Sequence, residues 1–179
     1  MVWRTRLSTK EGTVNVSLRI SETAYRALQE DAKKRNISLN TIANQIFLAY
    51  AEWDRHLSRF EMLKISHPTF AHILKAATEE AIAEAGRVAG ADVPPGVILS
   101  TKGELSVSSI LDWMKRMGTY SNLIDYSEIT HAGKTSVTLS HDLGPRWSLF
   151  LTSYFDSVFK SADKQVKFTQ HPGSVTFEL

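Results

Sequence analysis

Cysteine is absent from the 179-residue chain, and so is any long apolar run. Without cysteine there is no disulfide framework, no thiolate zinc site and no cysteine nucleophile. A cysteine-free chain is compatible with a reducing cytoplasm, where we expect this protein. No apolar run approaches the roughly 20 residues that span a bilayer, and the first twelve residues lack the apolar core of a secretory signal. We therefore expect no membrane-spanning segment.

Sequence motifs of the common enzyme classes are missing too: there is no Gly-rich phosphate loop, no GxSxG elbow and no HExxH. The histidines form no ligand pattern, because His67 and His72 are five residues apart around Pro68, and His131 and His141 fall at opposite ends of a predicted strand pair. Isolated histidines are usually surface or hydrogen-bonded core residues. We expect no catalytic residue, no cofactor and no metal, and an enzyme with an unusual site is the least favoured class.

Charge is nearly balanced but unevenly placed. Residues 1–64 hold eleven Lys/Arg and seven Asp/Glu, a net charge of +4, whereas residues 65–179 hold ten and twelve, a net charge of −2. A positive segment attracts polyanions. On charge alone, however, a solvated surface with chance asymmetry is the preferred interpretation.

The amino-terminal region begins with a polar segment and then alternates. Residues 1–12 are predicted to form a flexible basic arm that carries Arg4, Arg6 and Lys10. In residues 13–20, TVNVSLRI, apolar and polar side chains alternate, which predicts a strand with one apolar and one polar face. The apolar face carries Val14, Val16, Leu18 and Ile20, and the polar face carries Thr13, Asn15, Ser17 and Arg19.

Two helices are predicted directly after this strand. Ser21 is a good N-cap for a helix over residues 22–35, and Asn36 can adopt the left-handed conformation that ends it. Ser38 then caps a second helix that extends to Trp53. The apolar stripes consist of Ala24, Tyr25, Leu28 and Ala32 in the first helix and of Leu39, Ile42, Ala43, Ile46, Phe47, Tyr50 and Trp53 in the second.

One strand and two short helices are too small to fold as a monomer. An isolated strand leaves both backbone edges unpaired, and so small a core cannot offset the conformational entropy of the chain. Antiparallel pairing with the same strand of a second copy solves both problems. It gives a two-stranded ribbon over four helices, with the apolar strand face inside and the polar face outside. Such a ribbon fits the major groove of DNA.

Residues 13–53, TVNVSLRISETAYRALQEDAKKRNISLNTIANQIFLAYAEW, resemble the Arc/MetJ/CopG ribbon-helix-helix regulators of prokaryotes. The resemblance implies a homodimeric, sequence-specific DNA-binding transcriptional regulator in which Asn15, Ser17 and Arg19 contact bases. Many members have proline after the strand, where this chain has Ser21. The alternative is that these residues are a fragment of a larger α+β core.

The same resemblance implies a phosphate contact at the start of the second helix, in the motif Ser38-Leu39-Asn40-Thr41. It assigns Ser38, Asn40 and Thr41 to the phosphate, and helix N-terminal amides favour such an anion. The Ser38 hydroxyl can bind the phosphate or simply cap the helix, and the sequence leaves both open. The arm residues Arg4, Arg6 and Lys10 are further candidate DNA contacts.

The residue types suit base recognition. Arg19 can donate two parallel hydrogen bonds to guanine, and Asn15 can pair bidentately with adenine. Ser17 can donate or accept a hydrogen bond, so it discriminates less between bases. The polar face of the predicted strand therefore carries the expected sequence preference.

Beyond a ribbon-helix-helix domain over residues 13–56, we expect a helical linker over 57–67 and an α+β domain over 68–179. Helices are predicted over 69–89 and 106–117, separated by a loop at 90–96, a short strand VILS and a turn TKGE. Two hairpins follow, 123–131 with 135–141 and 165–170 with 175–179. Between the hairpins, Gly144-Pro145 begins an aromatic helix. This order predicts an antiparallel sheet with helices on one side.

The aromatic helix from Trp147 to Phe159 has two interpretations. Large aromatic side chains usually supply core area, whereas the alternative is an apolar pocket for a small effector or a second dimer surface. Asp142, in the turn before this helix, either holds His141 or caps the helix, and the sequence does not decide.

These patterns predict an α+β protein that binds double-stranded DNA as a homodimer, with a tetramer on DNA left open. The C-terminal domain is expected to serve dimerisation or effector sensing; some ribbon-helix-helix regulators sense a metal there. The rival class is an antitoxin-like or adaptor protein whose C-terminal domain binds a protein partner. A partner that folds an antitoxin tail would favour a disordered C-terminus, and this one is predicted to fold.

Overall fold

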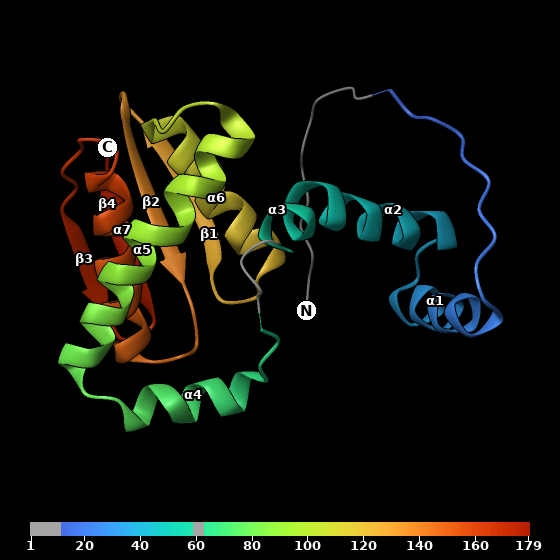
Figure 1. Ribbon diagram of the computed structural model, residues 1–179, viewed down its shortest axis with the longest axis horizontal. Coiled ribbons are helices and arrows are strands. Elements are labelled where there is room, and N and C mark those ends of the chain that lie inside the picture. Colours follow the sequence, from blue (N-terminus) through green and yellow to red (C-terminus); the bar gives the residue numbers. More distant parts are fainter. Residues whose placement is uncertain (1–11, 59–62) are drawn as a thin grey trace. The chain divides into compact units, whose positions relative to one another are not determined.

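A computed structural model describes residues 12–58 and 63–179 of the chain (Figure 1). The chain divides into two compact units, residues 1–55 and residues 56–179. The fold class is α+β, with a four-stranded antiparallel sheet late in the chain. In the described ranges no helix is both long enough and apolar enough to cross a membrane. The arm residues Arg4, Arg6 and Lys10 lie outside the described residues, and the expected linker over 57–67 lies partly outside them.

The first unit consists of an extended segment and two helices. α1 (Glu22–Arg35) begins at the predicted cap Ser21, and α2 (Leu39–Ala49) begins at the predicted cap Ser38. The second helix continues through the π-helical turn η1 (Tyr50–Asp54) into α3 (Arg55–Leu57). The strand expected over residues 13–20 is not seen: residues 12–20 have no regular secondary structure. A strand requires a partner, and the described part of this unit offers no other strand to pair with it.

The helices of the second unit correct two sequence predictions. The single helix expected over 69–89 is wrong, because α4 (His67–Ala76) ends before Thr78, whose side chain caps α5 (Glu79–Lys102). The loop and short strand expected over 90–100 are also wrong, because α5 continues through Pro94 and Pro95. α6 (Val107–Tyr120) and α7 (Pro145–Lys160) agree with the helices predicted after Ser106 and Gly144.

Packing against α7 explains why α5 continues through two prolines. A Cβ on Gly86 would lie 2.5 Å from the Phe150 carbonyl oxygen, and a Cβ on Gly90 would lie 2.1 Å from the Tyr154 carbonyl oxygen. The two helices therefore meet backbone to backbone, which only glycine permits. Downstream in α5, Pro94, Val97 and Ile98 are buried. This buried face offsets the poor helix propensity of the Pro-Pro-Gly segment.

The sheet is built from the two predicted hairpins. β1 (Asp125–His131) pairs with β2 (Lys134–Ser140), β3 (Phe168–His171) pairs with β4 (Ser174–Glu178), and β2 pairs with β4. The strand order is therefore β1-β2-β4-β3. One face of the central strands carries the buried residues Val137, Leu139, Val175 and Phe177. The opposite face carries the hydroxyl residues Ser136, Thr138, Ser140, Ser174 and Thr176, none of which is buried.

α4 is held to the rest of the second unit by polar contacts. Arg146 of α7 donates from Nη1 to the carbonyl oxygen of Leu74 at 3.1 Å and to that of Lys75. These are carbonyls of the last turn of α4, which lack partners within the helix. At the other end of α4, His67 Nε2 lies 2.8 Å from Asp142 Oδ1. Asp142 thus contacts His67, in place of either role expected from the sequence.

Candidate nucleic-acid interface

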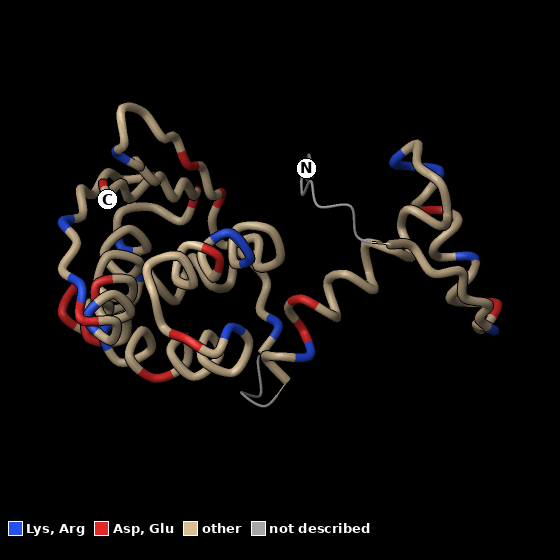
Figure 2. Tube along the Cα trace, turned by 90° about the horizontal axis from the view of Figure 1, so that it is seen from above, with Lys and Arg blue, Asp and Glu red and all other residues tan. Residues whose placement is uncertain are grey.

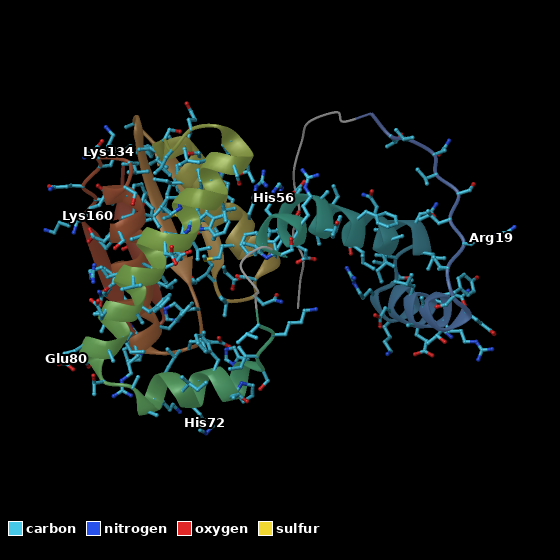
Figure 3. All side chains as sticks on the ribbon, viewed as in Figure 1. Arg19, His56, His72, Glu80, Lys134 and Lys160 are labelled. Carbon is cyan, nitrogen blue, oxygen red and sulfur yellow. The ribbon has the colours of Figure 1, made fainter. Side chains whose placement is uncertain are left out.

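The extended segment before α1 exposes its apolar side chains. The exposed fraction is 83% for Val14, 72% for Val16, 60% for Leu18 and 50% for Ile20. The polar residues between them are exposed as well, and Arg19 points away from the helices in Figure 3. A single chain therefore leaves the apolar series of this segment without a core.

The turn between the two helices is sharply defined. Asn36 adopts the left-handed conformation with φ of 52°, as its sequence position predicted. Its amide donates to the Lys33 carbonyl, and the amide of Ile37 donates to the Ala32 carbonyl at 3.0 Å. This pattern satisfies carbonyls at the end of α1. Only two residues then separate Asn36 from α2, so the N-terminus of α2 lies close to the end of α1.

The Ser38 side chain caps α2. Its Oγ accepts a hydrogen bond from the Thr41 amide at 3.0 Å and lies 2.7 Å from the Thr41 hydroxyl. Capping is thus the role that the structure displays for Ser38, and a phosphate contact stays a prediction. Asn40 and Thr41 are exposed on the same first turn. The amides of Leu39 and Asn40 belong to that turn and have no preceding helical carbonyl to bind.

Basic side chains lie beside this helix start. Lys33, Lys34 and Arg35 form the last turn of α1, and all three are exposed. They form a blue stretch of the tube in Figure 2. Arg35 Nη2 donates to Gln45 Oε1 at 2.6 Å, which links the end of α1 to α2. Positive side chains and the positive end of a helix dipole both favour an anion here.

The core inside the first unit is very small. Ala32 and Ile42 are the buried residues of α1 and α2, and Trp53 is buried in η1. Large apolar side chains elsewhere on the two helices remain exposed: Tyr25, Ile46, Phe47 and Tyr50 are 41–62% accessible. These residues belong to the apolar stripes predicted from the sequence. The periodicity alone does not show that the chain's own helices leave them uncovered.

One feature of this interface was missed in the sequence. The basic run Lys33-Lys34-Arg35 directly precedes Asn36 and the Ser38 cap. Three consecutive basic residues next to a predicted helix start are a signal for anion binding.

The second unit contains a histidine–serine pair that resembles a catalytic arrangement but has the wrong hydrogen bonding. Ser148 Oγ lies 2.9 Å from His141 Nε2 and 2.5 Å from the His171 carbonyl oxygen. A carbonyl only accepts, so the Ser148 hydroxyl donates a hydrogen bond to the His171 carbonyl oxygen and accepts one from His141 Nε2–H. His141 is therefore no base for this hydroxyl. The pair links the end of β2, α7 and the end of β3.

The environment of His141 favours the neutral ring. Burial lowers the pKa of His141, and the charge of Asp142 opposes this shift. His141 Nδ1 is buried and has no hydrogen-bond partner among the described residues. A buried nitrogen of this kind disfavours a second proton on the ring.

The aromatic helix α7 supplies the core of the second unit. Phe155 and Phe159 have 0% exposure, and Trp147 and Tyr154 are buried as well. The Phe159 ring packs against Phe177 of β4 with centroids 5.5 Å apart. This arrangement agrees with the core interpretation of the aromatic stretch. Among the described residues, no group of three or more His, Asp or Glu side chains is placed to hold a metal ion.

Comparisons with known proteins give no relative for this chain. No family model, no curated protein and no solved structure matches it.

Proposed function

We propose that the chain is a homodimeric, sequence-specific DNA-binding transcriptional regulator of the ribbon-helix-helix type. In this proposal, residues 13–20 of two copies pair as an antiparallel ribbon that enters the major groove. Asn15, Ser17 and Arg19 contact bases. The C-terminal unit serves dimerisation or effector sensing.

The observation that carries the proposal is the exposed apolar surface of the first unit. The alternating residues Val14, Val16, Leu18 and Ile20 are at least half exposed, and so are Ile46, Phe47 and Tyr50 of the second helix. Burying a large apolar side chain stabilises a protein by about 1.5–3 kcal/mol. A second copy that pairs through residues 13–20 would cover the strand series and add two helices to the same core.

The start of α2 supports the phosphate part of the proposal. The first-turn amides, the exposed Asn40 and Thr41, and the basic run at the end of α1 all lie within one short stretch of chain. Backbone amides and helix N-termini are common phosphate contacts in protein–DNA complexes, and they set the register of the protein on the duplex. In this proposal Ser38, Asn40 and Thr41 position the ribbon, and the ribbon reads the sequence. Arg4, Arg6 and Lys10 are additional candidate contacts.

A second candidate function is an antitoxin-like or adaptor protein whose C-terminal unit binds a protein partner. The C-terminal unit has its own sheet and an aromatic core, so it does not need a partner in order to fold. This favours the regulator over a tail that folds on a partner.

A binding experiment with two arginine variants tests the proposal. DNA selected from a randomised pool is titrated with the native chain, with Arg19→Ala and with the control Arg26→Ala. Both arginines are exposed, but Arg26 is paired with Glu22 on α1. Loss of a bidentate base contact costs about 1–3 kcal/mol, so Arg19→Ala should bind roughly 5–150-fold more weakly and relax the preference at one base pair per half-site. Equal losses for the two variants would refute base recognition by Arg19.

A further inference from the structure

β1 forms an outer edge of the sheet in the second unit. It is seven residues long, and all of its residues except Tyr126 are exposed. The opposite edge strand, β3, has only four residues. Within the described ranges, no other strand pairs with the outer side of β1. Gly118 of α6 packs against the start of this edge, since a Cβ on Gly118 would lie 3.1 Å from the Tyr126 amide nitrogen. The edge is open after Tyr126, and an open edge strand is a ready site for pairing with another chain.

The hydrogen bonds of β2 show which backbone groups of β1 point outward. Thr135 exchanges backbone hydrogen bonds of 3.1 and 2.9 Å with Leu179, directly after β4. Bonding sides alternate along a strand, so the odd-numbered residues of β2 bond toward β4 and the even-numbered ones bond toward β1. The register pairs those even-numbered residues with odd-numbered residues of β1. The residues of β1 whose N–H and C=O point away from the sheet are Tyr126, Glu128 and Thr130.

This alternation restricts how β1 can pair with a second copy of itself. In an antiparallel pair, residues whose N–H and C=O point away from the sheet must face residues of the same kind in the second copy. A twofold axis near the middle of β1 meets this condition when it passes through Glu128 or through Ile129. An axis at Glu128 places two carboxylates directly opposite, which is destabilising. An axis at Ile129 places Glu128 opposite Thr130 of the second copy. It also brings two Ile129 side chains together, each 70% exposed in the single chain.

We propose that β1 pairs antiparallel with β1 of a second copy around a twofold axis at Ile129, which joins the two sheets into one. The neighbouring Glu128 is compatible with this axis because it faces Thr130 of the second copy and keeps the contacts that it has within its own chain. Its Oε2 lies 2.8 Å from Lys115 Nζ and accepts a hydrogen bond from the Tyr126 hydroxyl at 2.6 Å. The inference goes beyond the ribbon, since it assigns a second contact to the homodimer.

The size of the contact fits an accessory role in the dimer. One pair of edge strands buries less than the roughly 1,200 Å² of a typical stable interface. The ribbon proposed above would hold two copies together and raise the effective concentration of β1. The edge contact itself uses only residues of the second unit.

The absence of cysteine makes a direct test possible. Single substitutions Ile129→Cys, Ser127→Cys and Glu128→Cys are made in the full chain, and disulfide-linked dimer is measured on non-reducing gels under mild oxidation. Across the axis, two residues at position 129 have Cα atoms about 4.5 Å apart, which a disulfide can bridge. Residues at position 127 lie on the same sheet face but about 13 Å apart, since four residues separate them along the strand.

Ile129→Cys should cross-link at least roughly tenfold faster than Ser127→Cys. Strand pairing holds the two thiols at position 129 together at an effective concentration far above that of unpaired chains in solution. Equal rates at positions 127 and 129 would overturn the proposal, and so would fast cross-linking at 128 with slow cross-linking at 129. The same variants in a Leu18→Asp background separate this contact from the ribbon. If the ribbon exists, all absolute rates fall while the ratio between positions 129 and 127 stays high. If it does not, the absolute rates are unchanged.

Discussion

Substitution of two glycines in α5 tests the backbone contact between α5 and α7. A Cβ on Gly90 would lie 2.1 Å from the Tyr154 carbonyl oxygen, 2.8 Å from the carbonyl carbon and 2.9 Å from the Cα. All three are backbone atoms, so no side-chain rotation relieves the contact. A Cβ on Gly96 of the same helix meets nothing within 4 Å. Gly96→Ala is therefore the matched control.

The two substitutions should change stability in opposite directions. Alanine is favoured over glycine in a helix by about 0.8–1 kcal/mol, and Gly96→Ala should gain about that amount. At Gly90 the helices must separate by more than 1 Å, and overpacking of this kind costs about 1–3 kcal/mol or more. The net effect of Gly90→Ala should be a loss of about 2 kcal/mol in the free energy of unfolding, which is roughly a 6–10 °C lower Tm for a unit of this size.

Near-UV circular dichroism during thermal and urea unfolding measures both changes, because α7 carries several buried aromatic residues. Gly90→Ala as stable as the native chain would show that α5 and α7 do not meet at this residue. A loss of stability for Gly96→Ala that matches the loss for Gly90→Ala would refute the steric reasoning.

Three further predictions concern other parts of the chain. Burial lowers the pKa of His141 in the folded state, so its contribution to stability is present above the ordinary pKa of about 6.5 and is lost as pH falls toward the folded value. His141→Gln should therefore flatten the pH dependence of the free energy of urea unfolding between pH 7 and 5.5. An unchanged pH dependence would contradict this. Arg146→Ala should speed hydrogen exchange in α4 but not in α6, and unchanged exchange in α4 would argue against its anchoring role. A fragment of residues 1–56 should dimerise and bind DNA more weakly than the full chain, whereas residues 66–179 should fold without binding DNA, as ultracentrifugation and DNA titration at two salt concentrations would show.

Local signals sufficed for much of the fold. The helix starts at Ser21, Ser38 and Ser106 were predictable because a cap needs only one side chain and the next amides. Both hairpins were predictable as well, since turn residues separate alternating segments. The aromatic helix α7 was predictable from the length and spacing of its apolar residues.

Long-range packing decided what the sequence did not show. The segment Pro94-Pro95-Gly96 has the composition of a loop, but the close approach of α5 to α7 at Gly86 and Gly90 holds it in a helix. The helix break at Thr78 was missed because the alanine-rich sequence on both sides of Thr78 is typical of one continuous helix. Asp142 pairs with His67, 75 residues away, and no local pattern contains such a contact.

The candidate DNA interface divides in the same way. The order of alternating segment, helix, tight turn and capped helix was readable from the sequence, and α1, the Asn36 turn and α2 agree with it. In the proposal the strand depends on a second copy, so a single chain is not expected to form it. The sequence therefore predicted the two helices and the turn between them. The base contacts and the pairing of two strands into a ribbon stay predictions.

Binding of selected DNA by the native chain and by Leu18→Asp tests the central claim most directly. Leu18 lies in the middle of the apolar series of residues 14–20, and a buried carboxylate without a partner strongly destabilises a core. We predict that randomised DNA yields an enriched sequence for the native chain, that two chains bind each enriched site, and that Leu18→Asp binds neither this DNA nor a second copy through its first unit. Enrichment of no sequence by the native chain, or equal binding of that DNA by Leu18→Asp, would contradict the ribbon as the DNA-binding element.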